Sequence, residues 1–247
     1  MRNLIPAKEI NPEAQNTTLS ELQKETENLI HLIKRGLGFY APKPVTSFSK
    51  SYRVQLALMA KIANDLKVIA QLAHDGFPIQ AGTVASSLSE TVWVSLDIRG
   101  DNKKAGKWLE HTEGKVSYGG NLTDFRKKTI TTVFGHNEQI AQEISEMARK
   151  GYEYLCRLKH GNPIYLKQLS YGQHENSEFP IIGSQLSNTA REHSFTCIKS
   201  SMQIVLYPLI HFCSDHLQEK PEEVQLLWDD IIELWKRLNL QNLEQNS

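Results

Sequence analysis

The sequence predicts an all-α fold: a single-domain multi-helix bundle with two long central helices and a long irregular loop before the last two helices. Two observations lead to this prediction. Apolar residues recur every three or four positions along most of the chain, which is the period of an amphipathic helix. No segment sustains the alternation of a β-strand, and no repeat of about 20–50 residues is present.

The first predicted helix begins at Thr18, because Thr18 and Glu21 have the spacing of a capping box. Gly36 and Gly38 end it, since glycine often follows the last turn of a helix. The start of the chain has no apolar run of signal-peptide length. We therefore expect three parts, an N-terminal arm, a helical bundle domain and a frayed tail: 1–17, 18–240 and 241–247.

A long helix comes next, capped by Ser49 or Ser51 and ended by Gly76. Its apolar residues cover more than one face, which is typical of a helix in the middle of a bundle. The third helix begins with Pro78, a favourable first-turn residue, and runs to Ile98. Its first half is rich in Ala, Gly and Ser, so we expect it to pack tightly against the second helix.

Shorter elements are expected in the middle of the chain. They are a helix over 101–111, a loop over 113–120 and a short helix from Asn121 or Thr123. A long amphipathic helix over 135–158 follows them.

Residues 161–186 are the least regular part of the sequence, with two Pro and three Gly, although a short helix over 165–169 fits the pattern. A long irregular stretch in a compact domain is usually functional or disordered. Two helices then close the chain, one over 187–217 with a kink at Pro208 and one over 221–238.

Composition excludes some classes of protein. Twenty-eight basic and twenty-eight acidic side chains give a net charge of zero, which argues against bulk binding to a polyanion. The three cysteines have no metal or redox spacing, so we expect buried, reduced thiols. No apolar stretch is long enough to cross a bilayer, and we predict a cytoplasmic protein without membrane contact or cofactor.

Glu90 is the only charged residue between Asp75 and Asp97. Leaving a carboxylate buried without a partner is costly, so Glu90 lies on a solvated stripe, forms a structural ion pair, or belongs to a functional site. The three interpretations stay open. We single out Glu90 as a candidate catalytic residue.

His160 follows the predicted helix over 135–158, where the negative end of the helix dipole favours a charged imidazole. Its segment, Lys159-His-Gly-Asn-Pro163, is equally well explained as a helix C-cap and turn, with Gly161 in the left-handed conformation. We treat His160 as a second candidate catalytic residue. Five neighbouring polar residues are candidates for binding: Arg157, Lys159, Asn162, Arg191 and His193.

Two further pairs on the last long helix invite chemical interpretation. Cys197 lies four residues after His193, but no orienting third group is identifiable, and a buried core thiol is the favoured interpretation. His211 and Asp215 share a helical face, yet a metal site needs further donors. We predict no metal site.

Several short motifs together resemble a known protein family. They are Ala85-Ser-Ser-Leu-Ser-Glu90, the acidic turn near Asp101 with Ala105 and Trp108, and Leu155-Cys-Arg-Leu-Lys-His-Gly-Asn-Pro163. They resemble an uncharacterised all-helical family of bacterial proteins, over about residues 52–163. That family is grouped loosely with HEPN-type helical bundles, many of which are RNA-cleaving toxins or defence factors.

The resemblance implies that Glu90 and His160 occupy the matching positions. The HEPN nuclease signature is an Arg followed, after four to six residues, by a His, and no Arg in this chain has a His at that distance.

Three functional hypotheses follow, and they leave open whether the protein is an enzyme. The first is a cytosolic protein that acts by interaction with a protein partner or with itself, in bacterial stress response or phage defence. The second is an RNA-directed hydrolase with Glu90 and His160 as acid–base partners, which requires both to reach one substrate or one bridging water. The third is a subunit of a homo-oligomer, with Trp228 and Trp235 on an exposed apolar patch.

Overall fold

The computed structural model describes most of the chain and confirms the all-α prediction, with one small β-hairpin in addition. The residues it describes are 12–38, 44–110, 138–174, 177–180, 183–185, 187–215, 222–223, 225–227, 229–231 and 233–234. The predicted loop over 113–120 and the helix from Asn121 or Thr123 lie outside these residues.

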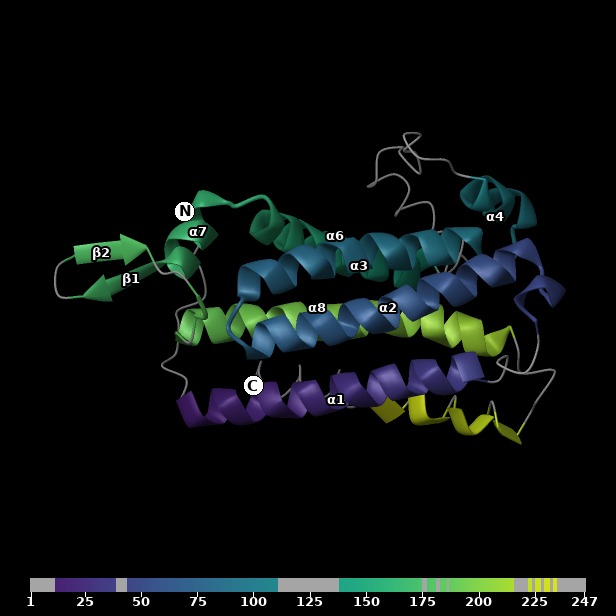
Figure 1. Ribbon diagram of the computed structural model, residues 1–247, viewed down its shortest axis with the longest axis horizontal. Coiled ribbons are helices and arrows are strands. Elements are labelled where there is room, and N and C mark those ends of the chain that lie inside the picture. The colour runs from purple at the N-terminus through teal and green to yellow at the C-terminus, as the bar shows by residue number, and fades with distance from the viewer. Residues whose placement is uncertain are drawn as a thin grey trace.

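Long helices with nearly aligned axes form the bundle (Figure 1). They are α1 (Pro12–Gly38), α2 (Lys50–His74), α3 (Pro78–Ile98), α6 (Glu138–Lys159) and α8 (Asn188–Ser214). Helix α2 packs against α1, α3 and α8, and α8 also contacts α1 and α3. Helix α6 covers α3, and the short helix α4 (Asn102–Leu109) packs against the start of α2. The central position predicted for α2 is therefore confirmed.

The first helix begins at Pro12, earlier than the predicted Thr18. Proline is favoured at a first helical position, so the earlier start is consistent with local chemistry. The Thr18–Glu21 capping-box pattern thus lies inside the helix. The apolar residues of α1 from Leu22 to Ile33 are buried in the core, except for the partly buried Ile30, as their helical spacing predicts.

The junction after α2 is fixed by Gly76. Its N–H donates to the Ala73 carbonyl and the Phe77 N–H to the Leu72 carbonyl, a Schellman motif with φ +81° at the glycine. A Cβ at Gly76 would lie 2.6 Å from the Gln185 carbonyl oxygen. Glycine is therefore required twice here, for its left-handed φ and for the close approach of the segment that leads into α8.

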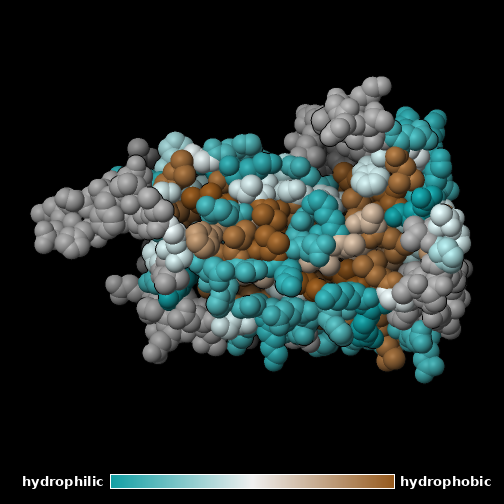
Figure 2. All heavy atoms as spheres, in the orientation of Figure 1, coloured by the Kyte–Doolittle hydropathy of each residue, from teal (hydrophilic) through white to brown (hydrophobic). Residues whose placement is uncertain are grey.

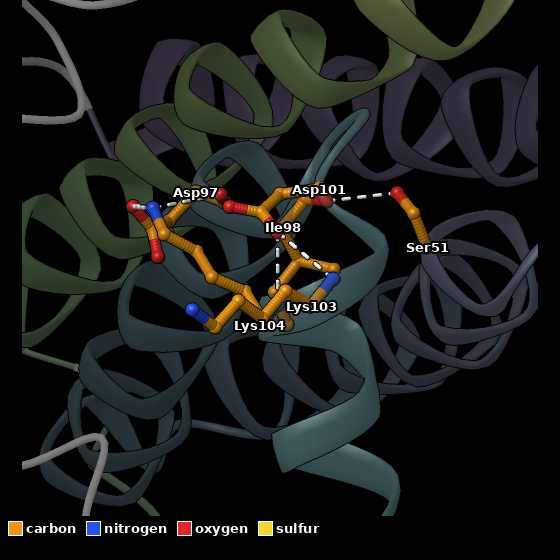
Figure 3. A network of polar contacts seen from close by, with 6 residues as sticks. All are labelled: Ser51, Asp97, Ile98, Asp101, Lys103 and Lys104. Atoms are coloured by element: carbon orange, nitrogen blue, oxygen red, sulfur yellow. Dashed lines mark hydrogen bonds and ion pairs between the residues drawn. The ribbon is translucent and has the colours of Figure 1, made fainter.

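A polar network ties the end of α3 to the start of α2 (Figure 3). The Ser51 hydroxyl donates to the Ile98 carbonyl at 2.8 Å, and Asp101 accepts from the N–H groups of Lys103 and Lys104 at 2.9 Å, as an N-cap of α4. Lys104 also pairs with Asp97 at 2.6 Å. Ser49, rather than Ser51, caps α2, so the Ser51 hydroxyl can make this link between helices.

The stretch 161–186 is more regular than predicted. It contains helix α7 (Pro163–Ser170), close to the short helix that the pattern allowed, followed by strands β1 (Tyr171–His174) and β2 (Ser177–Pro180). The strands pair antiparallel, and the hairpin projects past one end of the bundle (Figure 1). Each strand has only four residues, too few to show a sustained alternation in the sequence.

The described residues between 222 and 234 are helical, as predicted, with Leu227, Ile231 and Leu234 buried. Trp228 and Trp235 lie outside the described residues. On the face shown in Figure 2, hydrophobic atoms reach the surface between bands of hydrophilic ones. Among the described helices, none has both the length and the apolar character needed to cross a membrane.

Candidate functional site

Glu90 lies on α3 opposite α6, and its side chain is 39% exposed. The Tyr152 hydroxyl donates a hydrogen bond to Glu90 Oε1 at 2.9 Å, and Lys159 Nζ lies 3.8 Å from the same oxygen. Both partners belong to α6. Of the three interpretations of Glu90, the geometry matches the ion pair: a half-exposed carboxylate that links two helices.

The face of α6 that meets Glu90 carries Tyr152, Cys156 and Lys159, at the three- and four-residue spacing of one helical stripe. Burial, reinforced by hydrogen bonding to Cys156 and to Glu90, raises the pKa of Tyr152. The phenol therefore stays protonated and acts as a donor. Cys156 is half-buried, not buried as the sequence predicted, and it shares its stripe with the half-buried Tyr152 and the exposed Lys159.

This contact between α3 and α6 depends on a small residue. A Cβ at Gly82 would lie 2.7 Å from Leu158 Cδ1 and 2.9 Å from Leu158 Cβ. The small-residue half of α3 was expected to pack tightly against α2, and α3 does pack against α2, while Gly82 itself faces α6. Its missing side chain lets α6 come near enough for Tyr152 and Lys159 to reach Glu90.

His160 lies in the turn that ends α6, with an exposed side chain. Gly161 has φ +64°, its N–H donates to the Leu158 carbonyl, and the Asn162 N–H donates to the Arg157 carbonyl. These bonds form a Schellman motif, so the C-cap interpretation of the segment is confirmed. Among the described residues, the partners of the Glu90 carboxylate are Tyr152 and Lys159 and do not include His160.

The other predicted binding residues fall at different places. Arg157 is exposed in the last turn of α6, and Lys159 is the only one of the five that contacts Glu90. Asn162 comes just before α7, and its Oδ1 accepts from the Ile164 N–H at 3.0 Å. Arg191 is half-buried in the first turn of α8. The structure therefore distributes these residues along the end of α6 and the start of α8.

His193 belongs to a separate aromatic cluster where α6, α7 and α8 meet. Its Nδ1 lies 2.5 Å from the Tyr154 hydroxyl, and its ring stacks on Tyr154 with 5.7 Å between centroids. Tyr165 of α7 meets the His193 ring edge-on at 5.1 Å. Burial lowers the pKa of His193, which favours the neutral imidazole. The cluster fastens α7 to the bundle.

Cys197 is a core thiol, as the sequence favoured. Its side chain is fully buried, its Sγ lies 3.8 Å from the Pro78 carbonyl, and burial raises its pKa to about 12. A thiol held protonated in this way is a poor nucleophile.

His211 and Asp215 do share a face of α8, but a cation already lies between them. The Arg99 guanidinium donates to Asp215 Oδ2 at 2.8 Å, and its Nη1 lies 2.8 Å from His211 Nδ1. Burial, with the Arg99 charge, lowers the pKa of His211 to about 4. In the part of the chain that the structure describes, no three His, Cys, Asp or Glu residues gather as metal ligands.

One feature of this end of the molecule is absent from the sequence predictions. Helix α7 turns Leu169 into the core and Tyr165 toward it, but leaves Ile164 64% and Leu166 38% exposed. They lie two positions apart, so they flank the exposed face of this short helix on opposite sides instead of forming one stripe. The sequence signal was the run Pro-Ile-Tyr-Leu, which lay inside a segment expected to be irregular.

Comparison with protein-family models, curated proteins and solved structures finds no match to this chain.

Proposed function

We propose that the protein acts by association with another protein chain, through a surface at the α7 end of the bundle. We call this the α7 surface and define it by Pro163, Ile164 and Leu166, all exposed on α7. The observation that carries the proposal is the exposure of Ile164 and Leu166. Burying exposed apolar area of this kind is the main favourable term in protein association.

The neighbouring contacts support a docking role for α7. Tyr165 and His193 hold α7 against α8, and Asn162 caps its first turn, so its exposed side chains are presented on a fixed helix. A surface fixed before binding loses less conformational entropy when a partner docks. The described contacts of Glu90 supply a link between helices rather than an acid–base pair, and they give the hydrolase hypothesis no support.

The test is photo-crosslinking in bacterial cells, with a crosslinking amino acid in place of Ile164. The matched control carries it in place of Val68, which is 44% exposed on α2. We expect a discrete crosslinked product from position 164 only, weakened by Leu166→Ser. Mass spectrometry of the product distinguishes a second copy from a different protein. Equal labelling from both positions, or none from 164, would contradict the proposal.

The biological setting is proposed from the family resemblance: a cytoplasmic role in bacterial stress response or phage defence. The free cysteines, Cys156, Cys197 and Cys213, are consistent with a reducing compartment. Phage plating on cells that express the wild type or Ile164→Asp tests it. Protection by the wild type and its loss in the variant is the expected result. Equal plating on cells with and without the protein would refute the defence role.

A further inference from the structure

The two outer edges of the hairpin beyond α7 differ in the backbone hydrogen-bonding groups that they offer to another strand. Tyr171 is paired with Pro180, Gly172 with Phe179, Gln173 with Glu178, and His174 with Ser177. Residues opposite each other in an antiparallel ladder alternate between pairs that exchange two hydrogen bonds and pairs that exchange none. Proline has no N–H, so the Tyr171–Pro180 pair is of the second kind. The Gln173–Glu178 pair, two positions along, is of the second kind as well.

This alternation fixes which backbone groups point outward. On β1 the N–H and C=O groups of Tyr171 and Gln173 face away from β2 and are available to another strand. On β2 the corresponding residues are Glu178 and Pro180, and Pro180 has no hydrogen to donate. The outer edge of β1 therefore offers a complete pairing pattern, whereas that of β2 is interrupted.

Apart from its short length, β1 lacks the features that usually protect an edge strand. Proteins block exposed edges with proline, with charged side chains or by covering them. The four residues of β1, Tyr-Gly-Gln-His, include no proline and no Asp, Glu, Lys or Arg, whereas β2 contains both Glu178 and Pro180. The hairpin also projects past the end of the bundle (Figure 1). Among the described residues, β1 pairs with β2 alone.

We propose that β1 is a dimerisation edge, which pairs antiparallel with β1 of a second copy of this chain. An antiparallel pair of identical strands has two-fold symmetry, the commonest symmetry of protein dimers. Centred on Gly172, it sets Tyr171 of each chain opposite Gln173 of the other, so all the outward groups pair. No like charges meet, because β1 carries none of the four charged residue types.

The pairing also accounts for the stability of the hairpin. A two-stranded hairpin is marginal by itself in water, and the dimer makes it one half of a four-stranded sheet with the two β1 strands at its centre. Helix α7 leads directly into β1, so the same association brings the α7 surface to the interface. This inference rests on the proposed function and names its partner as a second copy.

Sedimentation equilibrium of the purified chain tests the proposal, with a matched pair of proline variants. Gln173→Pro removes an outward N–H from β1, and Glu178→Pro removes an outward N–H from β2. Neither removes a hydrogen bond within the hairpin, and proline is tolerated where the N–H of an edge strand faces solvent. We expect twice the mass of one chain for the wild type and for Glu178→Pro, and the mass of one chain for Gln173→Pro, all with the same far-UV circular dichroism.

Each other outcome overturns the dimerisation edge. A wild type with the mass of one chain excludes the dimer, and two dimeric variants locate the interface elsewhere. Two variants that dissociate equally assign the effect to the whole hairpin rather than to the edge of β1. If the wild type has the mass of one chain but position 164 still crosslinks to a different protein, the α7 surface is a docking site. Its partner is then not a second copy of this chain.

Discussion

Glu90 shows how a lone charge in an apolar helix is accommodated. Its carboxylate stays 39% exposed and lies within reach of a phenol and an ammonium group on α6, so it is never fully desolvated. An ion pair this open is screened by solvent and contributes between about 0 and 1 kcal/mol to stability. It joins α3 to α6 across a contact whose geometry is set by the packing of Gly82 against Leu158.

The first prediction concerns this contact. Glu90→Gln keeps an oxygen that accepts from Tyr152 and loses only the charge, so its free energy of unfolding should fall by less than about 1 kcal/mol. Tyr152→Phe removes the donor and should cost about 1 kcal/mol, with positive coupling between the two changes in a double-mutant cycle. Urea denaturation measures both. Because the proposed function uses α7, crosslinking from position 164 should survive Glu90→Gln; its loss at unchanged stability would restore Glu90 as a functional residue.

The second prediction concerns pH. Burial lowers the pKa of His193, and burial with the Arg99 charge lowers that of His211 to about 4, both below the value of about 6.5 for an unfolded histidine. Below that value the unfolded chain binds more protons than the folded one, so stability is complete above about pH 6.5 and falls as the pH drops toward 4. Urea midpoints between pH 7.5 and 4.5 measure the slope.

The variant His211→Gln should flatten this pH dependence, since it removes one of the imidazoles whose pKa is lowered. His31 is exposed on α1, so His31→Gln serves as the control and should leave the slope unchanged. A wild type whose stability is constant over this range, or equal slopes in both variants, would contradict the assignment.

At the scale of elements, the α3–α6 contact gives the third prediction. Gly82→Ala places a methyl group 2.9 Å from Leu158 Cβ, an atom close to the backbone that cannot rotate away. The two helices must separate, at a cost of about 1–3 kcal/mol. Gly151 is the matched control: it lies within α6, and a Cβ there would meet nothing within 4 Å, so Gly151→Ala should be neutral or stabilise by about 0.5–1 kcal/mol. Equal effects of the two variants would refute the close approach.

Most helices could be predicted from the sequence because their signals are local. The boundaries at Pro78 and Asp101 and the turn at Gly161 depend on capping chemistry within a few residues. The hairpin could not be predicted in the same way, because β1 and β2 are stabilised by each other and are too short to carry a period.

In the candidate site, too, single residues could be predicted from the sequence but their contacts could not. Glu90 and Lys159 were candidates from the sequence, but their ion pair was not predicted, and Tyr152 was not a candidate. Which stripe of α6 meets α3 is decided by the packing of Gly82 against Leu158, a contact between residues far apart in the chain. The helical spacing likewise predicted that His211 and Asp215 share a face. It could not predict that Arg99, at the end of α3, contacts both.

At the scale of the whole molecule, charge is distributed by depth. The segments 76–96 and 200–214 carry one charge between them, and the helices they form, α3 and α8, pack against each other. The charged residues lie mostly outside this pair of helices. The net charge of zero is therefore a balance between acidic and basic residues elsewhere in the chain. Ile164 and Leu166 of α7 break this arrangement, since they lie at the surface instead of in the core.

The bundle and the hairpin should therefore behave as separate parts. Tyr171 and Pro180 are partners across the ladder, so a linker of about three Gly or Ser residues can join the two ends when residues 171–180 are removed. The main core is built from the long helices, from Leu169 of α7 and from Leu227, Ile231 and Leu234. We therefore expect the free energy of unfolding of this deletion variant to change by less than about 1 kcal/mol. Its mass in sedimentation equilibrium should be that of one chain. A deletion variant that unfolds would show that the hairpin supports the bundle, and one that still dimerises would place the contact between copies on the helices.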